Sequence, residues 1–536
     1  MDHLNIISQS SSLTLIIIIS LGFVIFGVLH SKKYQGLNNY LVANRSVGVF
    51  SLTTSLVASA LGAWILFGPA SAATWGGIGA VIGYALGTAF PLFILIFLGE
   101  KFRKLYPKGK TLIEVVRLRF GTKLFKLILF LTVFYMFIFL IAEVTAVSIL
   151  VNYISGTTLW ITALIVIVSS LVYTLYGGLR ASIFTDNIQF IIILILLLIS
   201  FINLISFNFS EFNFEFIKQS KPFLLSFDYL PNFTAGLTFF IAVAATNLFH
   251  QGNWQRVYAA KNNKVLKKSL IISFLIIIPI VFFMGFSGLV AVSISSNVVP
   301  DLAFFSLLLT EQTLMLSVIV IVLAISLTIS SVDTLINAIS SLIVVDGNKV
   351  LNFKGDYLKL SKYFIISLSI IAFAIASKGL SILYLFLLAD LLCCAAVLTV
   401  FYSFYDKKIN EKNAYTSILI GLLAGLLLFP SPDFSKSILI GILFPVSNFP
   451  SFISQSLLFL SFLFATFFAG YLKLSSDPLI VLLKLIFSLS FIYLFGLPGS
   501  GKNYIGNILK NHYNFYVQDA DEYLLPDMKE CINNGI

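Results

Sequence analysis

Asp186 and Gln189 lie one helical turn apart near the start of an apolar segment, after a glycine pair at Gly177 and Gly178 and a single Arg180. A carboxylate and a primary amide are costly to place in a bilayer, and membrane helices that carry them usually use them in an ion or substrate pathway. The spacing therefore makes transport the leading hypothesis for this chain.

A second group of oxygen-bearing side chains occupies the apolar segment 313–345. Hydroxyl groups recur there at adjacent turns, including Ser330 and Ser331, and Asp333 and Asn337 fall four residues apart on one helix face. Hard oxygen ligands of this kind suit sodium. The alternative is that the hydroxyls bond to their own helix backbone, but an intramembrane Asp among them favours a functional role.

The segment 49–75 combines small residues with Gly68-Pro69 and a later pair, Gly76-Gly77. This composition predicts a helix that is interrupted at mid-membrane, where an unwound turn frees carbonyl oxygens to coordinate a cation. Close packing through small residues is the alternative.

Glu143 and Asp390 each stand deep in an apolar segment. Burying an unpaired carboxylate is costly, so each side chain is predicted to face a cavity, a partner or a proton. Contact with a polar or cationic substrate, proton coupling and a structural network all remain open for the pair.

The composition places these residues in a membrane protein. The 536 residues are 59% hydrophobic and 11% charged, with a mean hydropathy of +1.00, whereas soluble chains are about 25% charged. The net charge of +11 is interpreted as basic cytoplasmic loops rather than as a nucleic-acid surface. Two of the three cysteines lie in an apolar segment, so no disulfide framework is expected.

Apolar stretches of about 20 residues predict the membrane spans. The thirteen candidates are about 13–29, 49–75, 79–99, 124–151, 157–176, 184–206, 233–250, 266–294, 313–345, 361–377, 381–404, 414–430 and 455–472. Most of the 34 Lys and Arg residues fall in the loops of one side, which predicts an outside N-terminus and a cytoplasmic C-terminus.

Four segments of the sequence together resemble the sodium:solute symporter family, which includes proline, pantothenate, urea and sugar cotransporters. They are Tyr173–Gln189, 49–75, 313–345 and the segment Phe249–Lys261, which follows the seventh predicted span. The resemblance implies an all-α polytopic membrane protein of about 13 transmembrane helices. Its core would be two inverted five-helix repeats, spans two to six and seven to eleven, with ion and substrate bound near the midplane.

The resemblance also implies which residues bind. The implied sodium site consists of three backbone carbonyls and two hydroxyls, those of Ala58, Leu61, Leu327, Ser330 and Ser331. Ser331 stands where Thr is usual, and Ala60 stands where the proline-transporting branch has Asp. The candidates for substrate contact or coupling are Trp64, Glu143, Asp186, Gln189, Asp333 and Asp390. Trp254 and Arg256 are each interpreted as interfacial anchors.

The C-terminal region carries a different pattern, G-x-x-x-x-G-K, formed by Gly496, Gly499, Gly501 and Lys502. Such loops cradle phosphates, but Asn503 replaces the usual hydroxyl ligand of magnesium. The surrounding 45 or so residues resemble small-molecule kinases and are too few for a complete core. Residues 1–475 are therefore expected to form the transmembrane domain and 488–536 a truncated kinase-like fragment, with nucleotide binding completed by a second chain, or a nonfunctional tail, as alternatives.

The sequence thus predicts sodium-coupled symport of a small organic solute, such as proline, urea or a hydroxylated compound, in a bacterial inner membrane. The expected partners are the solute, the sodium ion and membrane lipid, with no cofactor, no enzymatic activity and no nucleic acid. Proton coupling, a transporter-like sensor and a membrane-tethered kinase are the alternatives.

Overall fold

The computed structural model describes residues 4–472, except for 35, 208–216, 220, 227, 295–297, 311–312, 351–352, 407–408, 433–436 and 440–457. The chain divides into two compact units, Met1–Ser476 and Asp477–Ile536. The phosphate-loop pattern from Gly496 to Lys502 and the predicted boundary at 488 lie outside the described residues.

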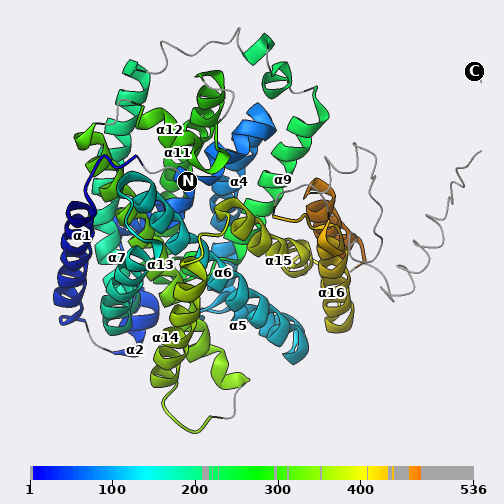
Figure 1. Ribbon diagram of the computed structural model, residues 1–536. Helices are drawn as coiled ribbons and strands as arrows, with labels where there is room; N and C mark the ends of the chain where they lie inside the picture. The colour runs from blue at the N-terminus through cyan, green and yellow to red at the C-terminus, as the bar shows by residue number, and fades with distance from the viewer. Residues whose placement is uncertain are drawn as a thin grey trace, which may run out of the picture. The chain divides into compact units, whose positions relative to one another are not determined.

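The described part of the first unit is helical, as predicted (Figure 1). Nine described helices are long and apolar enough to cross a membrane: α1 (Gln9–Ser31), α4 (Gly68–Leu105), α6 (Thr122–Ser155), α7 (Leu159–Phe207), α9 (Leu230–Phe249), α11 (Asn263–Ile294), α13 (Leu314–Val345), α14 (Tyr357–Ala376) and α15 (Ile382–Tyr402). Shorter helical elements that matter for the sites are α2 (Leu37–Val42), η1 (Ala43–Arg45), α3 (Val49–Ala60), η2 (Ala63–Leu66), α5 (Leu112–Phe120), α10 (Gln251–Ala259), η5 (Gly347–Lys349) and α16 (Glu411–Leu428).

The predicted separation of the spans 157–176 and 184–206 agrees with the structure, in which α7 consists of two helices joined at a kink at the non-helical Gly178. The span predicted at 49–75 is divided between α3 and the first part of α4. The count of thirteen and the inverted repeats therefore stay predictions, while the helical membrane class is confirmed.

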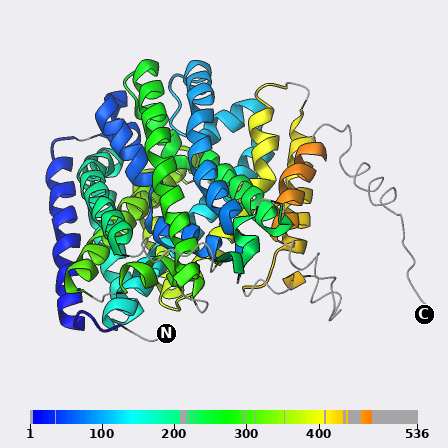
Figure 2. The ribbon, with the colours of Figure 1, turned by 90° about the horizontal axis from the view of Figure 1, so that it is seen from above.

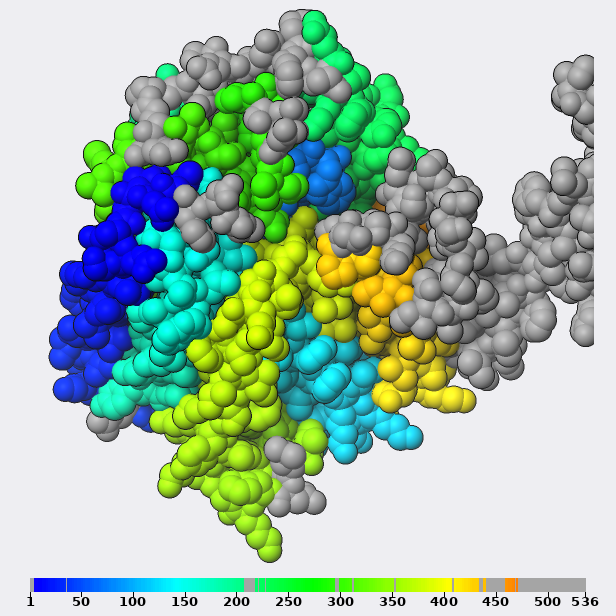
Figure 3. Space-filling view, viewed as in Figure 1, coloured from blue at the N-terminus to red at the C-terminus, as the bar shows by residue number. Residues whose placement is uncertain are grey.

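α13 lies at the centre of the described bundle. It packs against α6, α7 and α14 (Figure 1), and 83% of its most apolar 18-residue stretch is buried. α1, by contrast, lies at the edge in both ribbon views, and α14 lies at the surface in front of the bundle in the space-filling view (Figures 2 and 3). The hydroxyl-rich segment is thus shielded from lipid by neighbouring helices.

Small residues allow α4 to approach its neighbours closely. A Cβ atom at Gly83 would lie 2.8 Å from the carbonyl carbon of Gly236 in α9 and closer still to its oxygen, and one at Gly288 of α11 would meet the carbonyl group of Ala70 in the same way. Such contacts between backbones are how membrane helices gain packing energy without a hydrophobic driving force. These contacts fix α4 between α9 and α11. They therefore also fix Gly68, the first residue of α4, where the helix interruption described next ends.

The interruption predicted within 49–75 is confirmed. The last hydrogen bond of α3 runs from the Leu61 amide to the Val57 carbonyl at 2.9 Å, after which Leu61 and Gly62 leave the helical conformation. One short turn, η2, follows before α4 starts at Gly68-Pro69. The carbonyls at the end of α3 therefore lose their helical partners in the interior of the protein.

The kink in α7 yields a test of the fold. Gly178 adopts φ 58° and ψ −150°, a region that only glycine adopts readily, and a Cβ there would lie 2.7 Å from the Tyr40 carbonyl oxygen. Gly178→Ala should lower the free energy of unfolding by about 1–3 kcal/mol. Thermal unfolding of the detergent-purified chain measures this loss. Gly22→Ala in α1, where a Cβ meets no atom within 4 Å, is the control and should be neutral or stabilising.

Candidate functional site

The helix break lies directly against α13. A Cβ atom at Gly62 would approach the Ser331 hydroxyl to 2.5 Å, and the Glu143 carboxylate more closely still. Ala58, Leu61 and Leu327 are fully buried beside it. The structure therefore brings the predicted sodium ligands of α3 and α13 to adjoining positions, and only glycine fits at the point of contact.

The two serines point in different directions. The Ser330 hydroxyl donates to Asp186 Oδ1 at 2.7 Å, whereas the Ser331 hydroxyl donates to the Leu327 carbonyl at 3.0 Å. Both hydroxyl oxygens keep lone pairs for a cation, because each group is a donor in these bonds. Their role as sodium ligands stays a prediction that this placement permits.

Glu143 of α6 reaches the break from the other side. Its Oε2 accepts a hydrogen bond from the Ala63 amide at 2.8 Å, so the carboxylate caps the first turn after the break. This contact explains in part how a carboxyl group can be buried in α6. Glu143 also lines a cavity, so the same side chain contacts the backbone and an open space.

That cavity lies beside the break and is formed by α3, η2, α4, α6, α9, α13 and α15. Its volume is about 50 Å³, enough for a few waters or part of a small solute. The lining residues are Ser59, Ala60, Trp64, Tyr84, Phe139, Glu143, Val243, Thr246, Asn247, His250, Ser331, Leu335, Phe386 and Asp390. Three of the predicted substrate contacts, Trp64, Glu143 and Asp390, therefore share one cavity.

The cavity is acidic and aromatic. Asp390 accepts a hydrogen bond from the Thr246 hydroxyl at 2.6 Å, and no Lys or Arg is among the lining residues. Among the described residues, neither Glu143 nor Asp390 forms an ion pair within 4.0 Å. Stacked Trp64 and Tyr84, with ring centres 5.8 Å apart, form one wall. Carboxylates beside aromatic faces are the groups that attract an organic cation.

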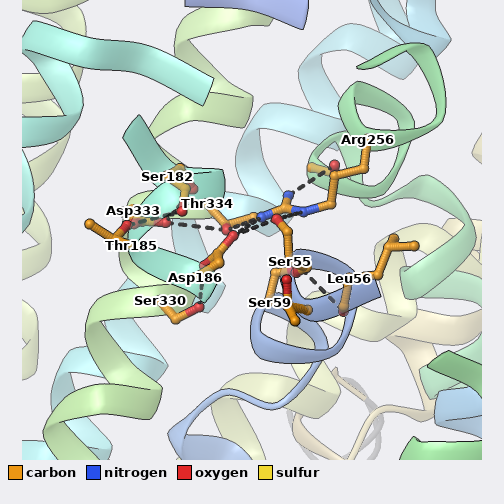
Figure 4. A network of polar contacts seen from close by, with 12 residues as sticks. Ser55, Leu56, Ser59, Ser182, Thr185, Asp186, Arg256, Ser330, Asp333 and Thr334 are labelled. Carbon is orange, nitrogen blue, oxygen red and sulfur yellow. Dashed lines mark hydrogen bonds and ion pairs between the residues drawn. The ribbon is translucent and has the colours of Figure 1, made fainter. Parts of the chain in front are cut away.

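Asp186 lies outside this cavity, in a buried ion pair with Arg256 (Figure 4). Arg256 Nη2 lies 2.8 Å from Asp186 Oδ2, and both side chains are fully buried. Ser55 of α3 donates to the same carboxylate at 2.5 Å, and Arg256 also donates to Ser55 and to Thr334 of α13. The pair thus ties together α3, α7, α10 and α13.

Asp333 extends the same network one turn beyond Ser330, because the Thr334 hydroxyl accepts from Arg256 and lies 3.3 Å from Asp333 Oδ1 (Figure 4). It accepts hydrogen bonds from Ser182 at 2.8 Å and from the Tyr173 hydroxyl, both on α7. Gln189 is fully buried, and its amide has no hydrogen-bond partner among the described residues. Asp186, Gln189 and Asp333 do not line the cavity, so direct contact with a substrate there is not supported for these three candidates. A coupling role for them stays a prediction.

The interpretation of Trp254 and Arg256 as interfacial anchors is wrong. Both side chains are fully buried, and the Trp254 ring donates to the Leu248 carbonyl at 2.7 Å. An interior carboxylate such as Asp186 needs a cation, and that need was the one signal in the sequence that pointed to Arg256. Tyr84, Thr246 and His250 carried no such signal, because Tyr84 is far in the sequence from the other two and only folding brings them together at the cavity.

Comparisons with known proteins agree with this architecture. Residues 40–421 match the family model described as the sodium:solute symporter family. The spermidine transporter DUR31 of Candida albicans is 27% identical over 399 residues, 73% of this chain and 74% of that protein. Sodium/glucose cotransporter 1 of Ovis aries is 30% identical over 174 residues, 31% of this chain and 25% of that protein, so this match spans only a quarter of its length.

Solved structures show the same fold. A Na⁺-coupled sialic acid symporter, in a substrate-bound outward-open state, aligns with a TM-score of 0.67 and 17% identity over 87% of this chain and 98% of its own. Mhp1, a nucleobase-cation-symport-1 family transporter, aligns with a TM-score of 0.50 and 13% identity over 83% of this chain and 98% of its own. At these identities the likeness concerns the fold alone.

The buried ion pair yields a second test. Arg256→Gln leaves Asp186 buried without its cation and should lower the free energy of unfolding by about 3–5 kcal/mol, because an unpaired buried charge keeps its desolvation cost. Thermal unfolding compares it with Arg256→Gln/Asp186→Asn, which removes both charges and should recover part of the loss. A double variant no more stable than the single one would contradict the ion-pair interpretation.

Proposed function

This chain belongs to the sodium:solute symporter family, and from that premise we propose that it is a sodium-coupled symporter of a small organic cation. The observation that carries the proposal is the cavity at the helix break, which presents Glu143 and Asp390 without a Lys or Arg among its lining residues. A positively charged amine would supply the missing charge. The similarity to a protein named as a spermidine transporter supports the same class of substrate.

The proposed sodium site lies where α3 ends. The carbonyls of Ala58 and Leu61 carry the negative end of the α3 helix dipole and have lost helical partners, so a cation there would satisfy them. The Leu327 carbonyl and the hydroxyls of Ser330 and Ser331 approach from α13 and would complete a shell of five oxygens. No cofactor other than this ion is proposed.

The same residues suggest how ion and solute are coupled. The solute cavity adjoins the proposed sodium site. Ser59 and Ala60, which line the cavity, lie in the sequence between two proposed sodium ligands, and Ser331 lines the cavity and is itself a proposed ligand. A sodium ion that fixes the end of α3 against α13 therefore also fixes one wall of the cavity. Because such coupling is reciprocal, a bound solute would strengthen sodium binding by the same factor. Alternating access would then carry both across the membrane.

Proton coupling is a second candidate, favoured by the same two carboxyl groups, which could carry a proton in place of a cationic solute. Uptake driven by an imposed pH gradient in the absence of sodium would establish it and exclude the sodium mechanism.

The remaining sequence-based expectations stand as proposals. The distribution of basic loops supports an orientation with the N-terminus outside, and the bias toward Ile, Asn, Lys and Phe supports a bacterial inner membrane. Residues 488–536, with Gly496, Gly499, Gly501 and Lys502, are proposed to be a kinase-like segment without a role in transport.

The sodium site is tested by removing one hydroxyl at a time. Ser330→Ala and Ser331→Ala should each raise the sodium concentration for half-maximal uptake roughly tenfold, since a bond to a charged group contributes about 1.5–3 kcal/mol. Uptake of labelled spermidine into proteoliposomes measures this. Ser367→Ala on the exposed face of α14 is the control. Unchanged sodium dependence in both site variants would remove these serines from the site.

The cation site is tested at Asp390. Asp390→Asn keeps the shape but removes the charge, and should raise the KM for spermidine about 30-fold or more, since removing a buried charge partner costs at least about 2 kcal/mol. Glu100→Gln, at a carboxylate of α4 outside the cavity, is the matched control. Sodium-dependent thermal stabilisation of Asp390→Asn should stay at the wild-type level. Sodium-driven accumulation of glucose, proline or urea in place of spermidine would contradict the proposed substrate class.

A further inference from the structure

A second, larger cavity lies away from the helix break. Its volume is about 640 Å³, and it lies between the α2–η1 segment, the loop that precedes α5 and the end of α13 with η5. The basic residues that line it are Arg45, Lys108, Lys110 and Lys349, and Glu114 is the one acidic residue of its lining. The predicted topology places all these segments on the cytoplasmic side.

The charge of Glu114 is already engaged. Its Oε2 accepts hydrogen bonds from the amides of Lys110 at 2.8 Å and Thr111 at 3.3 Å, and its Oε1 lies 3.3 Å from Lys349 Nζ. Lys349 is also 3.4 Å from Asp346. Lys349 is thus shared between two carboxylates, and the four basic residues of the lining outnumber Glu114 and Asp346 by two.

The other basic residues of the lining are Arg45, Lys108 and Lys110. Within the described ranges, Arg45, Lys108 and Lys110 form no ion pair within 4.0 Å. Arg45 donates one bond to the Gly109 carbonyl at 2.7 Å and lies 5.6 Å from the centre of the Tyr258 ring. Burial raises the pKa of Tyr258, so its hydroxyl stays neutral and does not offset the positive charge. The cavity thus carries an uncompensated positive field.

The backbone that carries Arg45 adopts an energetically unfavourable conformation. Ala43, Asn44 and Arg45 have φ angles of 46°, 51° and 54°, in the left-handed region that residues with a Cβ rarely adopt. Three such residues in succession persist only where the surroundings enforce them, and such segments gather at ligand-binding sites. Asn44 and Arg45 both line the cavity. The strained turn is thus a second feature, independent of charge, that points to a ligand.

We propose that this cavity binds a phosphate-bearing ligand. Arg and Lys side chains are the usual partners of phosphate, and apolar walls formed by Leu41, Val42, Val344 and Val345 strengthen their field. Basic pockets at the cytoplasmic ends of membrane helices suit phospholipid headgroups, and a soluble phosphate compound offers the same chemistry. The ligand would bridge the α2–η1 segment to the end of α13, so it could act on the helix that bears the proposed sodium site.

The test uses the full chain in detergent and does not depend on transport. Thermal unfolding is followed at constant sodium and ionic strength while dioctanoyl phosphatidylglycerol, dioctanoyl glycerol or pyrophosphate is added. The phosphate-bearing probes should raise the melting temperature saturably, and dioctanoyl glycerol should not. A response to the phospholipid alone assigns a lipid headgroup, and a response to pyrophosphate assigns a soluble phosphate ligand.

Variants locate the effect. Lys108→Gln/Lys110→Gln should raise the apparent Kd at least tenfold, whereas Lys264→Gln/Lys268→Gln, the same charge change at exposed lysines of α11, should leave it unchanged. Asn348→Asp, which adds a negative charge at an exposed position of the lining without removing any described contact, should also weaken binding. Equal weakening by both lysine pairs, or no saturable shift with either phosphate-bearing probe, would overturn the proposal.

Discussion

Backbone groups inside a bilayer must find partners within the protein, and the break between α3 and α4 is where a helix stops providing them. Glu143 satisfies the Ala63 amide on one side of the break. On the other side, the carbonyls at the end of α3 face a helix that is rich in hydroxyl groups. The proposed sodium ion would therefore complete the hydrogen-bonding and charge requirements of the fold, and its binding would organise the adjoining cavity.

The buried carboxyl groups divide according to their partners. Asp186 is neutralised by Arg256, and Asp333 is held by hydroxyl groups of α7. Glu143 and Asp390 face the cavity without an ion-pair partner in the described part of the chain. In the proposed function the organic cation would therefore bind at the cavity and not at Asp186, whose charge already ties α3 to α7, α10 and α13.

The class of fold and the helix break could be predicted from the sequence, because both follow from local features. Hydropathy identifies apolar helices, and Gly68-Pro69 with the small residues around it marks an interruption. The boundary between the spans 157–176 and 184–206 could also be predicted, because the glycine pair Gly177-Gly178 marks it and the structure has a kink at Gly178.

The site itself was only partly predictable. Glu143 and Asp390 are conspicuous because isolated charges in apolar segments are rare. Arg256 was misinterpreted because its sequence neighbours suit a membrane interface, and its burial depends on Asp186, 70 residues away in the chain. Aromatic residues such as Tyr84 and Phe386 are common in any apolar helix, so their gathering around one cavity is a property of packing alone.

The most direct test of the account is the effect of sodium on solute binding at equilibrium. Calorimetric titration of the purified protein with spermidine, in sodium chloride and then in choline chloride, measures the Kd under both conditions. The account predicts a Kd at least several-fold lower in sodium, and an equal effect of spermidine on sodium affinity, because both ligands order the end of α3. The same spermidine Kd in both salts would contradict a sodium-organised cavity.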